Sequence, residues 1–504
     1  MFESPKVNWC RHATPNETTA GRALYVPGGK ILGGTSAING VIFNRGQRMD
    51  YDRWSAAGCR GWSYQEVLPY FKKLESTDIG DDRYRGRDGP IKVTRAGKIS
   101  PFYDTFIRSA QALGYPLNPD YSGASQFGVS MAQLTVWRGL RQSVANTYLA
   151  TARRRPNLEL QTNSQVTSLI LEGKRCVGVR YHHGGRAHEA RATREVIVSA
   201  GAIATPQLLE LSGIGQPEVL RRVGIPLVHP LGGVGEHLRD HFGPTLKWTF
   251  KRRSLSLAGR GRGLRLLGEI ARYVLTRNGF ISQGIATMRV FARSHDAVDQ
   301  ADITLMANPY FTEIVNSKRR MSNLHGFFII AQVQRPESMG SIHVRSADPF
   351  ESPDIRYNML VTEQDRRTAI AAFRRAREIA SAPPLADEID QEILPGPQVR
   401  SDDEILDFIR ATGATTYHLV GTCRMGTDDM SVVDERLRVH GLQGLRIADA
   451  SIMPLIVSGN TSIPCMMIGE KCADMILQDH ADGDRRVSAG LAEHTHKETI
   501  KETA

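Results

Sequence analysis

A single histidine stands beside a glycine-containing turn late in the chain, in the segment 415–426 (TTYHLVGTCRMG). Imidazole has a reference pKa near 6.5, so a neutral His418 can accept a proton from a substrate at neutral pH. His418 is therefore a candidate general base. The alternative is a core histidine whose ring nitrogens are satisfied by hydrogen bonds within the protein.

A glycine-rich stretch at 28–40 (GGKILGGTSAING) could bind a ligand through its backbone. Its first seven residues include four glycines, which let the backbone approach a ligand closely. Consecutive N–H groups in such a loop can bind phosphate or the polar edge of a ring. An ordinary glycine-rich loop is the alternative that glycine content alone leaves open.

Two histidines and an aspartate, His237, His241 and Asp240, lie close together in residues 231–241. This clustering suggests a metal site, but no third group of ligands follows nearby, and structural histidines are common. The six cysteines form no C-x-x-C pair, so the zinc and redox-dithiol patterns are excluded. We therefore predict that the chain binds no metal.

The composition excludes several classes of protein. A net charge of +11 favours anionic surroundings, but no nucleic-acid-binding motif accompanies it. No run of about 18 apolar residues is present, so no transmembrane helix is expected, and the N-terminus has no signal-peptide pattern. Residues 251–277 are strongly basic and amphipathic, which is typical of a helix on an anionic bilayer or of one packed on its own domain. The expected location is cytoplasmic, with peripheral membrane contact left open.

The elements that must position these residues alternate between strand and helix patterns. Residues 196–198 are a short apolar run, as a buried parallel strand would be, and a turn and a helix capped by Thr205 follow. Another strand ends in Asp449. Alternation over 300–360 indicates an antiparallel sheet. Further strands are expected at 158–162, 166–171 and 177–181, and helices at 63–74, 102–113, 140–155, 362–380 and 401–411.

Three blocks of residues together resemble the glucose–methanol–choline (GMC) oxidoreductases, close to their choline- and alcohol-dehydrogenase branch. The blocks are 29–54, 199–215, and the pair of His418 and Asn460. The resemblance covers residues 20–479. It implies an FAD-dependent enzyme that oxidises the CH–OH group of a primary alcohol to an aldehyde by hydride transfer to flavin N5, with His418 as base. A quinone or oxygen would accept the electrons, and lyase chemistry on the same fold is an alternative.

The resemblance also implies a fold and a set of site residues. The fold is α/β (α+β overall): a Rossmann-like FAD-binding domain (1–60, 152–240 and 400–479) is interleaved with a substrate-binding domain on an antiparallel sheet (61–151 and 241–399), and 480–504 form a flexible tail. The implied catalytic residues are His418, Asn460 and Ser462. The residues implied to contact the cofactor are Gly33, Gly34, Asn39, Gly40, Val41, Val166, Ser199, Gly201, Asp449 and Ala450.

Three features depart from the family's pattern. Ser462 stands where the family has histidine or asparagine, and its hydroxyl could hydrogen-bond the substrate oxygen or only cap the next helix. Ile38 stands where some members carry the histidine that attaches FAD covalently, so non-covalent FAD is expected. The chain contains no G-x-G-x-x-G turn, so the first βαβ unit is expected to be incomplete. This predicts weak or absent FAD binding, and a truncated, inactive remnant is the alternative to an active enzyme.

Overall fold

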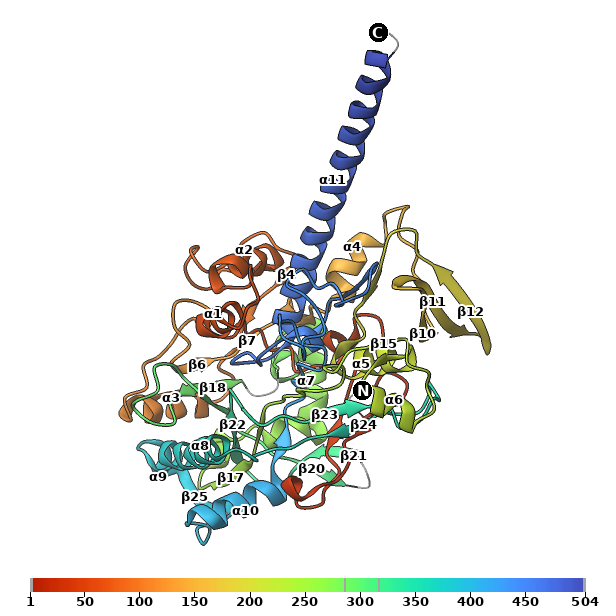
Figure 1. Ribbon diagram of the computed structural model, residues 1–504. Coiled ribbons are helices and arrows are strands. Elements are labelled where there is room, and N and C mark those ends of the chain that lie inside the picture. Colours follow the sequence, from red (N-terminus) through yellow and green to blue (C-terminus); the bar gives the residue numbers. More distant parts are fainter. Residues whose placement is uncertain (1–2, 285–286, 316–317, 502–504) are drawn as a thin grey trace.

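A computed structural model of the protein describes residues 3–284, 287–315 and 318–501 (Figure 1). Its largest sheet is antiparallel throughout and has the strand order β25-β17-β22-β19-β18-β6. The strands span Ile389–Leu394, Thr245–Phe250, Gly326–Val333, Ile303–Asn308, Met288–Ala292 and Gly128–Met131, in that order. The prediction of an antiparallel sheet over 300–360 is therefore confirmed, and the sheet also recruits strands from both sides of that range.

The two faces of this sheet differ in polarity, because successive side chains of a strand point to opposite faces. One face buries apolar side chains such as Val290, Leu305 and Ile329 in the first of two large cores, beneath α8 (Glu363–Ser381) and α3 (Phe102–Ala112). The opposite face presents residues in register across β6, β18 and β19: Ser130 pairs with Arg289, and Arg289 with Met306. We call this the polar face.

The second core surrounds a short parallel pair, β13 (Val196–Val198) and β27 (Leu445–Ile447). The prediction of a parallel strand at 196–198 is confirmed. The predicted start of the next helix at Thr205 is wrong, since α5 runs from Gly201 to Leu211. The Asp449 carboxylate accepts the Gly201 N–H at 2.8 Å and the Thr205 hydroxyl at 2.6 Å, so a distant segment caps this helix.

Several helices begin where their capping residues predict. Ser63 forms a capping box with Glu66 before α2 (Tyr64–Leu74), and Thr362 caps α8 through the Asp365 N–H at 3.2 Å. The helix α10 (Asp402–Thr412) starts after Ser401. Two predictions are wrong: 158–162 is not a strand, and within 140–155 only Ala145–Leu149 and α4 (Ala150–Ala152) are helical. The strands predicted at 166–171 and 177–181 are confirmed: β10 (Ser164–Glu172) and β11 (Arg175–His183) form an antiparallel sheet with β12 (Arg186–Arg191).

The last helix, α11 (Ser462–Lys501), leaves the body of the molecule as a long single helix (Figure 1). It continues through most of the segment expected to be a flexible tail, in which alanine, the best helix former, is the commonest residue. The first part of α11 packs against α2 in the second core. Within the described ranges, no helix has the length and apolar character needed to cross a bilayer.

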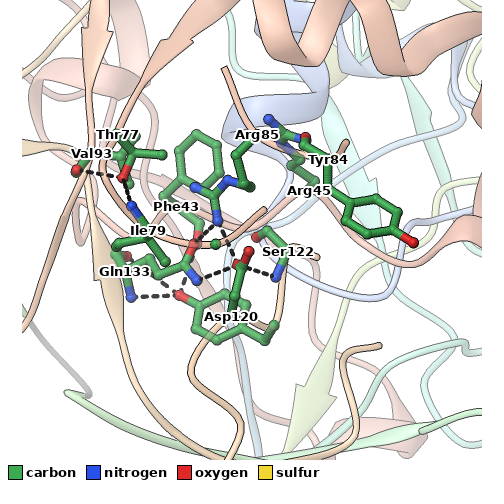
Figure 2. Close-up of polar contacts among 12 residues, drawn as sticks. Phe43, Arg45, Thr77, Ile79, Tyr84, Arg85, Val93, Asp120, Ser122 and Gln133 are labelled. Carbon is green, nitrogen blue, oxygen red and sulfur yellow. Dashed lines mark hydrogen bonds and ion pairs between the residues drawn. The ribbon is translucent and has the colours of Figure 1, made fainter. Parts of the chain in front are cut away.

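A buried ionic cluster fixes the loop that follows the glycine-rich stretch (Figure 2). Glu75 contacts Arg45 at 2.5 Å and Arg85 at 2.8 Å, and Arg85 also contacts Asp120 at 2.5 Å. Gln133 donates to the same Asp120 carboxylate at 2.8 Å. Two cations and two anions balance in this cluster, as buried charges require.

The two cores do not follow the predicted domain boundaries at every point. Trp62 and Phe71 lie in the second core with the parallel strands, although 61–151 is assigned to the substrate-binding domain. Ile405 and Ile409 of α10 lie in the first core with the antiparallel sheet, although 400–479 is assigned to the FAD-binding domain. The division into two interleaved domains itself stays a prediction.

Candidate active site

The backbone of His418 is fixed by a buried aspartate. The Asp240 carboxylate accepts the His418 N–H and the Tyr357 hydroxyl, at 2.8 and 2.9 Å, and also the Thr415 hydroxyl. Tyr417, between Thr415 and His418, has a φ of 66°, a left-handed conformation that costs energy in a bulky residue. Asp240 therefore supports a strained turn that presents His418.

The His418 ring contacts His241, which the sequence analysis considered only as a metal ligand. The two Nδ1 atoms are 2.9 Å apart, and His241 Nε2 lies 2.8 Å from the Gln334 carbonyl oxygen at the end of β22. Burial lowers the pKa of His241 to about 4. Burial, followed by the nearby His241 and Arg289, holds the pKa of His418 well below its usual value. Both rings are therefore neutral at physiological pH.

Asn460 meets the other nitrogen of the His418 ring. Its Nδ2 lies 2.9 Å from His418 Nε2, while its Oδ1 is buried and has no partner among the described residues. Ser462 does not contact His418; its hydroxyl lies 3.4 Å from Asn39 Nδ2 in the glycine-rich stretch, and it is the first residue of α11 rather than the residue before it. The segment 460–462 therefore joins His418 to the predicted flavin loop.

The glycine-rich stretch has the backbone geometry that its composition predicts. Gly33 and Gly34 have φ values of 87° and 53°, and Val41 is held at 55°. Arg141 donates to Asn39 Oδ1 at 2.7 Å, which orders the loop. A Cβ added at Gly34 would meet no atom within 4 Å, and one at Gly40 would meet a single atom, at 4.0 Å. These glycines border open space, which suits a loop that lies against a ligand.

The predicted nucleotide-binding residues are partly assembled. Asp449 and Gly201 are hydrogen-bonded to each other, and Ala450 is the first residue of the short helical turn Ala450–Ile452. Ser199 is exposed, and Val166 is exposed on β10. A Cβ added at Gly201 would meet no atom within 4 Å. With the unsatisfied Asn460 Oδ1, these open glycines fit a bound flavin nucleotide.

Sequence reasoning missed three residues around His418. His241 was noted, but not as a partner of His418; Gln334 and Arg289 carried no motif. Arg289 is buried on the polar face of β18, near enough for its charge to lower the pKa of His418. The one sequence signal for His241 is that it directly follows Asp240, because neighbouring residues of the chain can both reach the same turn.

Comparisons with known proteins show the family of the chain. Family models described as GMC oxidoreductase match residues 11–243 and 336–469. The chain is 39% identical to the oxygen-dependent choline dehydrogenase of Chromohalobacter salexigens over 94% of this chain and 85% of that protein. It is 37% identical to an alcohol dehydrogenase [acceptor] of Pseudomonas putida, over 95% and 87% of the two chains.

A solved structure is also similar. The crystal structure of pyridoxine 4-oxidase from Mesorbium loti aligns with a TM-score of 0.83 at 27% identity, covering 93% of this chain and 88% of that one. These matches confirm the expected family and fold class. The chain belongs to the GMC oxidoreductase family and is an FAD-dependent oxidoreductase.

Proposed function

We propose that this protein oxidises the CH–OH group of a primary alcohol to an aldehyde, with His418 as the base that takes the hydroxyl proton. When bound, the flavin supplies the hydride acceptor, N5. The observation that carries the proposal is the hydrogen-bond chain Gln334–His241–His418–Asn460, because it determines which nitrogen of His418 is free to accept a proton.

The direction of each hydrogen bond in this chain follows from the chemistry of its ends. A carbonyl oxygen can only accept, so His241 Nε2 carries the proton and donates to Gln334. Neutral His241 then has an unprotonated Nδ1, which accepts the proton of His418 Nδ1. Neutral His418 is left with a lone pair on Nε2, where Asn460 donates. His418 is thereby held in the tautomer in which Nδ1 carries the proton and Nε2, which faces Asn460, does not.

This arrangement supports distinct roles for the two residues. His418 Nε2 takes the alcohol proton, and the Asn460 amide, whose N–H already lies at that nitrogen, hydrogen-bonds the substrate oxygen as its charge grows. We assign Ser462 to positioning, since its hydroxyl contacts Asn39 and not His418. Oxygen or a quinone would accept the electrons.

Replacing the base tests the proposal. His418→Ala should slow anaerobic flavin reduction by alcohols by roughly 10²–10⁴-fold, the usual contribution of a general base, with FAD content unchanged. The control is His188→Ala, because His188 is exposed on β12 and is distant from His418 in the sequence. A near-normal rate of flavin bleaching in His418→Ala would remove His418 from this role.

We propose that FAD is bound without a covalent bond. Ile38, which is 8% exposed, offers no nucleophile to the flavin ring. Asn39, Gly34, Gly201 and Asp449 would hold the cofactor through backbone and polar contacts. Acid precipitation should release all FAD into the supernatant. Titration with FAD, followed by absorbance, measures its affinity; flavin that stays with the acid-precipitated protein would contradict a non-covalent site.

The helix α7 (Gly263–Thr276) supports a peripheral contact with an anionic bilayer. None of its described residues is buried, and Leu264 and Leu275 are 85% and 82% exposed. Arginines at 260, 262, 265 and 272 accompany these apolar side chains. Exposed apolar residues in a basic helix are the combination that binds the headgroup region of anionic membranes.

A vesicle assay tests this contact. The protein should float with vesicles containing phosphatidylserine and not with pure phosphatidylcholine vesicles, and the double variant Leu264→Glu/Leu275→Glu should lose binding. Leu477→Glu is the matched control, because Leu477 is 69% exposed on α11. Equal flotation of the double variant would exclude α7 as the contact.

A further inference from the structure

Arg289 is a buried cation on the polar face of the six-stranded sheet. It lies in the middle of β18, between Ser130 of β6 and Met306 of β19, and is 3% exposed. Its chain neighbours Met288 and Val290 point the other way, into the apolar core. The guanidinium therefore lies on the side of the sheet away from the core, toward the interior where Gln334 and His241 meet.

No group of the described chain balances this charge. Arg289 forms no ion pair or hydrogen bond with any described side chain, and its Nε is buried without an acceptor. The other deeply buried arginines behave differently: Arg45 and Arg85 share carboxylates, and Arg446 is paired with Glu195. An unpaired buried cation costs several kcal/mol, so proteins keep one chiefly where a ligand pairs with it.

The unpaired charge lies in the same interior as the proposed base. Its positive charge lowers the pKa of His418. Burial raises the pKa of Tyr121, and the charge of Arg289 opposes that rise. The buried carboxylate that contacts His418, that of Asp240, already accepts the His418 N–H and the Tyr357 hydroxyl. In the described part of the chain, no free anion is therefore left beside His418 to pair with Arg289.

We propose that Arg289 binds a carboxylate carried by the alcohol substrate, so that the substrate class is hydroxy carboxylates; this rests on the function proposed above. A guanidinium can bind a carboxylate through two parallel hydrogen bonds. The single positive charge of Arg289 would balance the single negative charge of the substrate carboxylate. A quaternary ammonium alcohol would be repelled by Arg289 and would need an acidic or aromatic cage. Choline is therefore disfavoured, although relatives are named for it.

Paired substrates of equal length test the proposal. The FAD-loaded enzyme is assayed with ω-hydroxy carboxylates from glycolate to 6-hydroxyhexanoate, each against the diol of equal length, and with choline. The best carboxylate should exceed its diol in kcat/KM. Arg289→Met should lower that kcat/KM about 30-fold or more, since truncating one partner of a buried charge pair costs at least about this factor. The loss for the diol should be smaller.

Thermal unfolding provides a readout independent of turnover. The preferred carboxylate should raise the Tm of the wild type and not that of Arg289→Met, and Arg289→Met alone should be more stable than wild type, because a buried unpaired charge is removed. Arg180→Met, on exposed β11, removes one charge elsewhere and should change none of these values.

The outcomes separate the two proposals. Equal losses for carboxylate and diol in Arg289→Met, a lower Tm in that variant, or a wild-type preference for choline would each overturn the assignment of Arg289. If the wild type oxidises no alcohol of any charge, the function proposed above fails. The Tm shift by the carboxylate series then still decides whether Arg289 binds an anion.

Discussion

The tautomer of His418 can be tested by replacing the residue that sets it. His241→Asn places an amide oxygen near the position of the imidazole Nδ1, so it keeps an acceptor for the His418 Nδ1 proton. His241→Gln instead keeps a donor near Nε2, toward the Gln334 carbonyl. His241→Leu keeps neither. The proposal predicts that flavin reduction is fastest in His241→Asn. It should be slower, to a similar degree, in His241→Gln and His241→Leu.

The magnitude follows from the contacts. A buried N–H that loses its acceptor costs about 1–3 kcal/mol, and at about 1.36 kcal/mol per factor of ten this corresponds to roughly 5- to 160-fold in rate if the wrong tautomer is populated instead. The Thr416 hydroxyl, 3.0 Å from His418 Nδ1, remains as a second acceptor. We therefore expect about tenfold for His241→Gln, near the low end, and a larger loss when Thr416→Val is added.

The assay is stopped-flow bleaching of the flavin under anaerobic conditions with saturating alcohol, with FAD content measured beforehand. Stability provides a control: each amide variant keeps one of the two hydrogen bonds of His241, so His241→Asn and His241→Gln should lose similar stability although His241→Gln is slower. If rate and stability rank in the same order, His241 acts only through folding, and the tautomer argument fails.

Three further predictions concern ionisable groups. Glu75→Gln leaves the buried Arg85 without its full counter-charge and should lower the free energy of unfolding by about 3–5 kcal/mol, as measured by urea denaturation; a loss under 1 kcal/mol would contradict this. Burial opposes charge on His343, but the hydrogen bonds that it donates to Glu210 and Glu236 outweigh burial and raise its pKa to about 9. Because the folded-state pKa is raised, this stabilisation is full below pH 6.5 and is lost as the pH rises through 9, and His343→Gln should remove that slope from the urea midpoints. Because the pKa of His418 is lowered, the acid limb of kcat/KM should lie below pH 6.5; a limb above 6.5 that His418 variants shift would contradict this.

Local sequence signals predicted the elements whose causes are local. Ser63, Thr362 and Ser401 mark helix starts because a capping side chain bonds a backbone N–H only three residues away. The helix beginning at Gly201 was misplaced for the opposite reason. Its cap is the carboxylate of Asp449, which is distant in sequence, and no local pattern around Thr205 could reveal that contact.

The same distinction divides the candidate site. His418, Asn460 and Asn39 could be predicted because each belongs to a block of residues that resembles the family, and their roles stay predictions. His241 and Arg289 were not found, since their roles depend on which residues lie opposite them after folding. A shift of β18 by one residue would bury Arg289 in the apolar core and place Val290 on the polar face. The role proposed for Arg289 is therefore possible only in this register.

Unsatisfied polar atoms define this site more sharply than any single motif. Asn44 accepts from Gln126, Gln126 accepts from Gln334, and the Gln334 carbonyl receives His241. Three buried atoms of this network, continued to Asn460, have no partner among the described residues. They are Asn44 Nδ2, Gln334 Oε1 and Asn460 Oδ1. Each such atom costs about 1–3 kcal/mol, so a core selected only for stability would replace it. The network joins three distant parts of the chain to His418, so this interior is polar although it lies beside an apolar core.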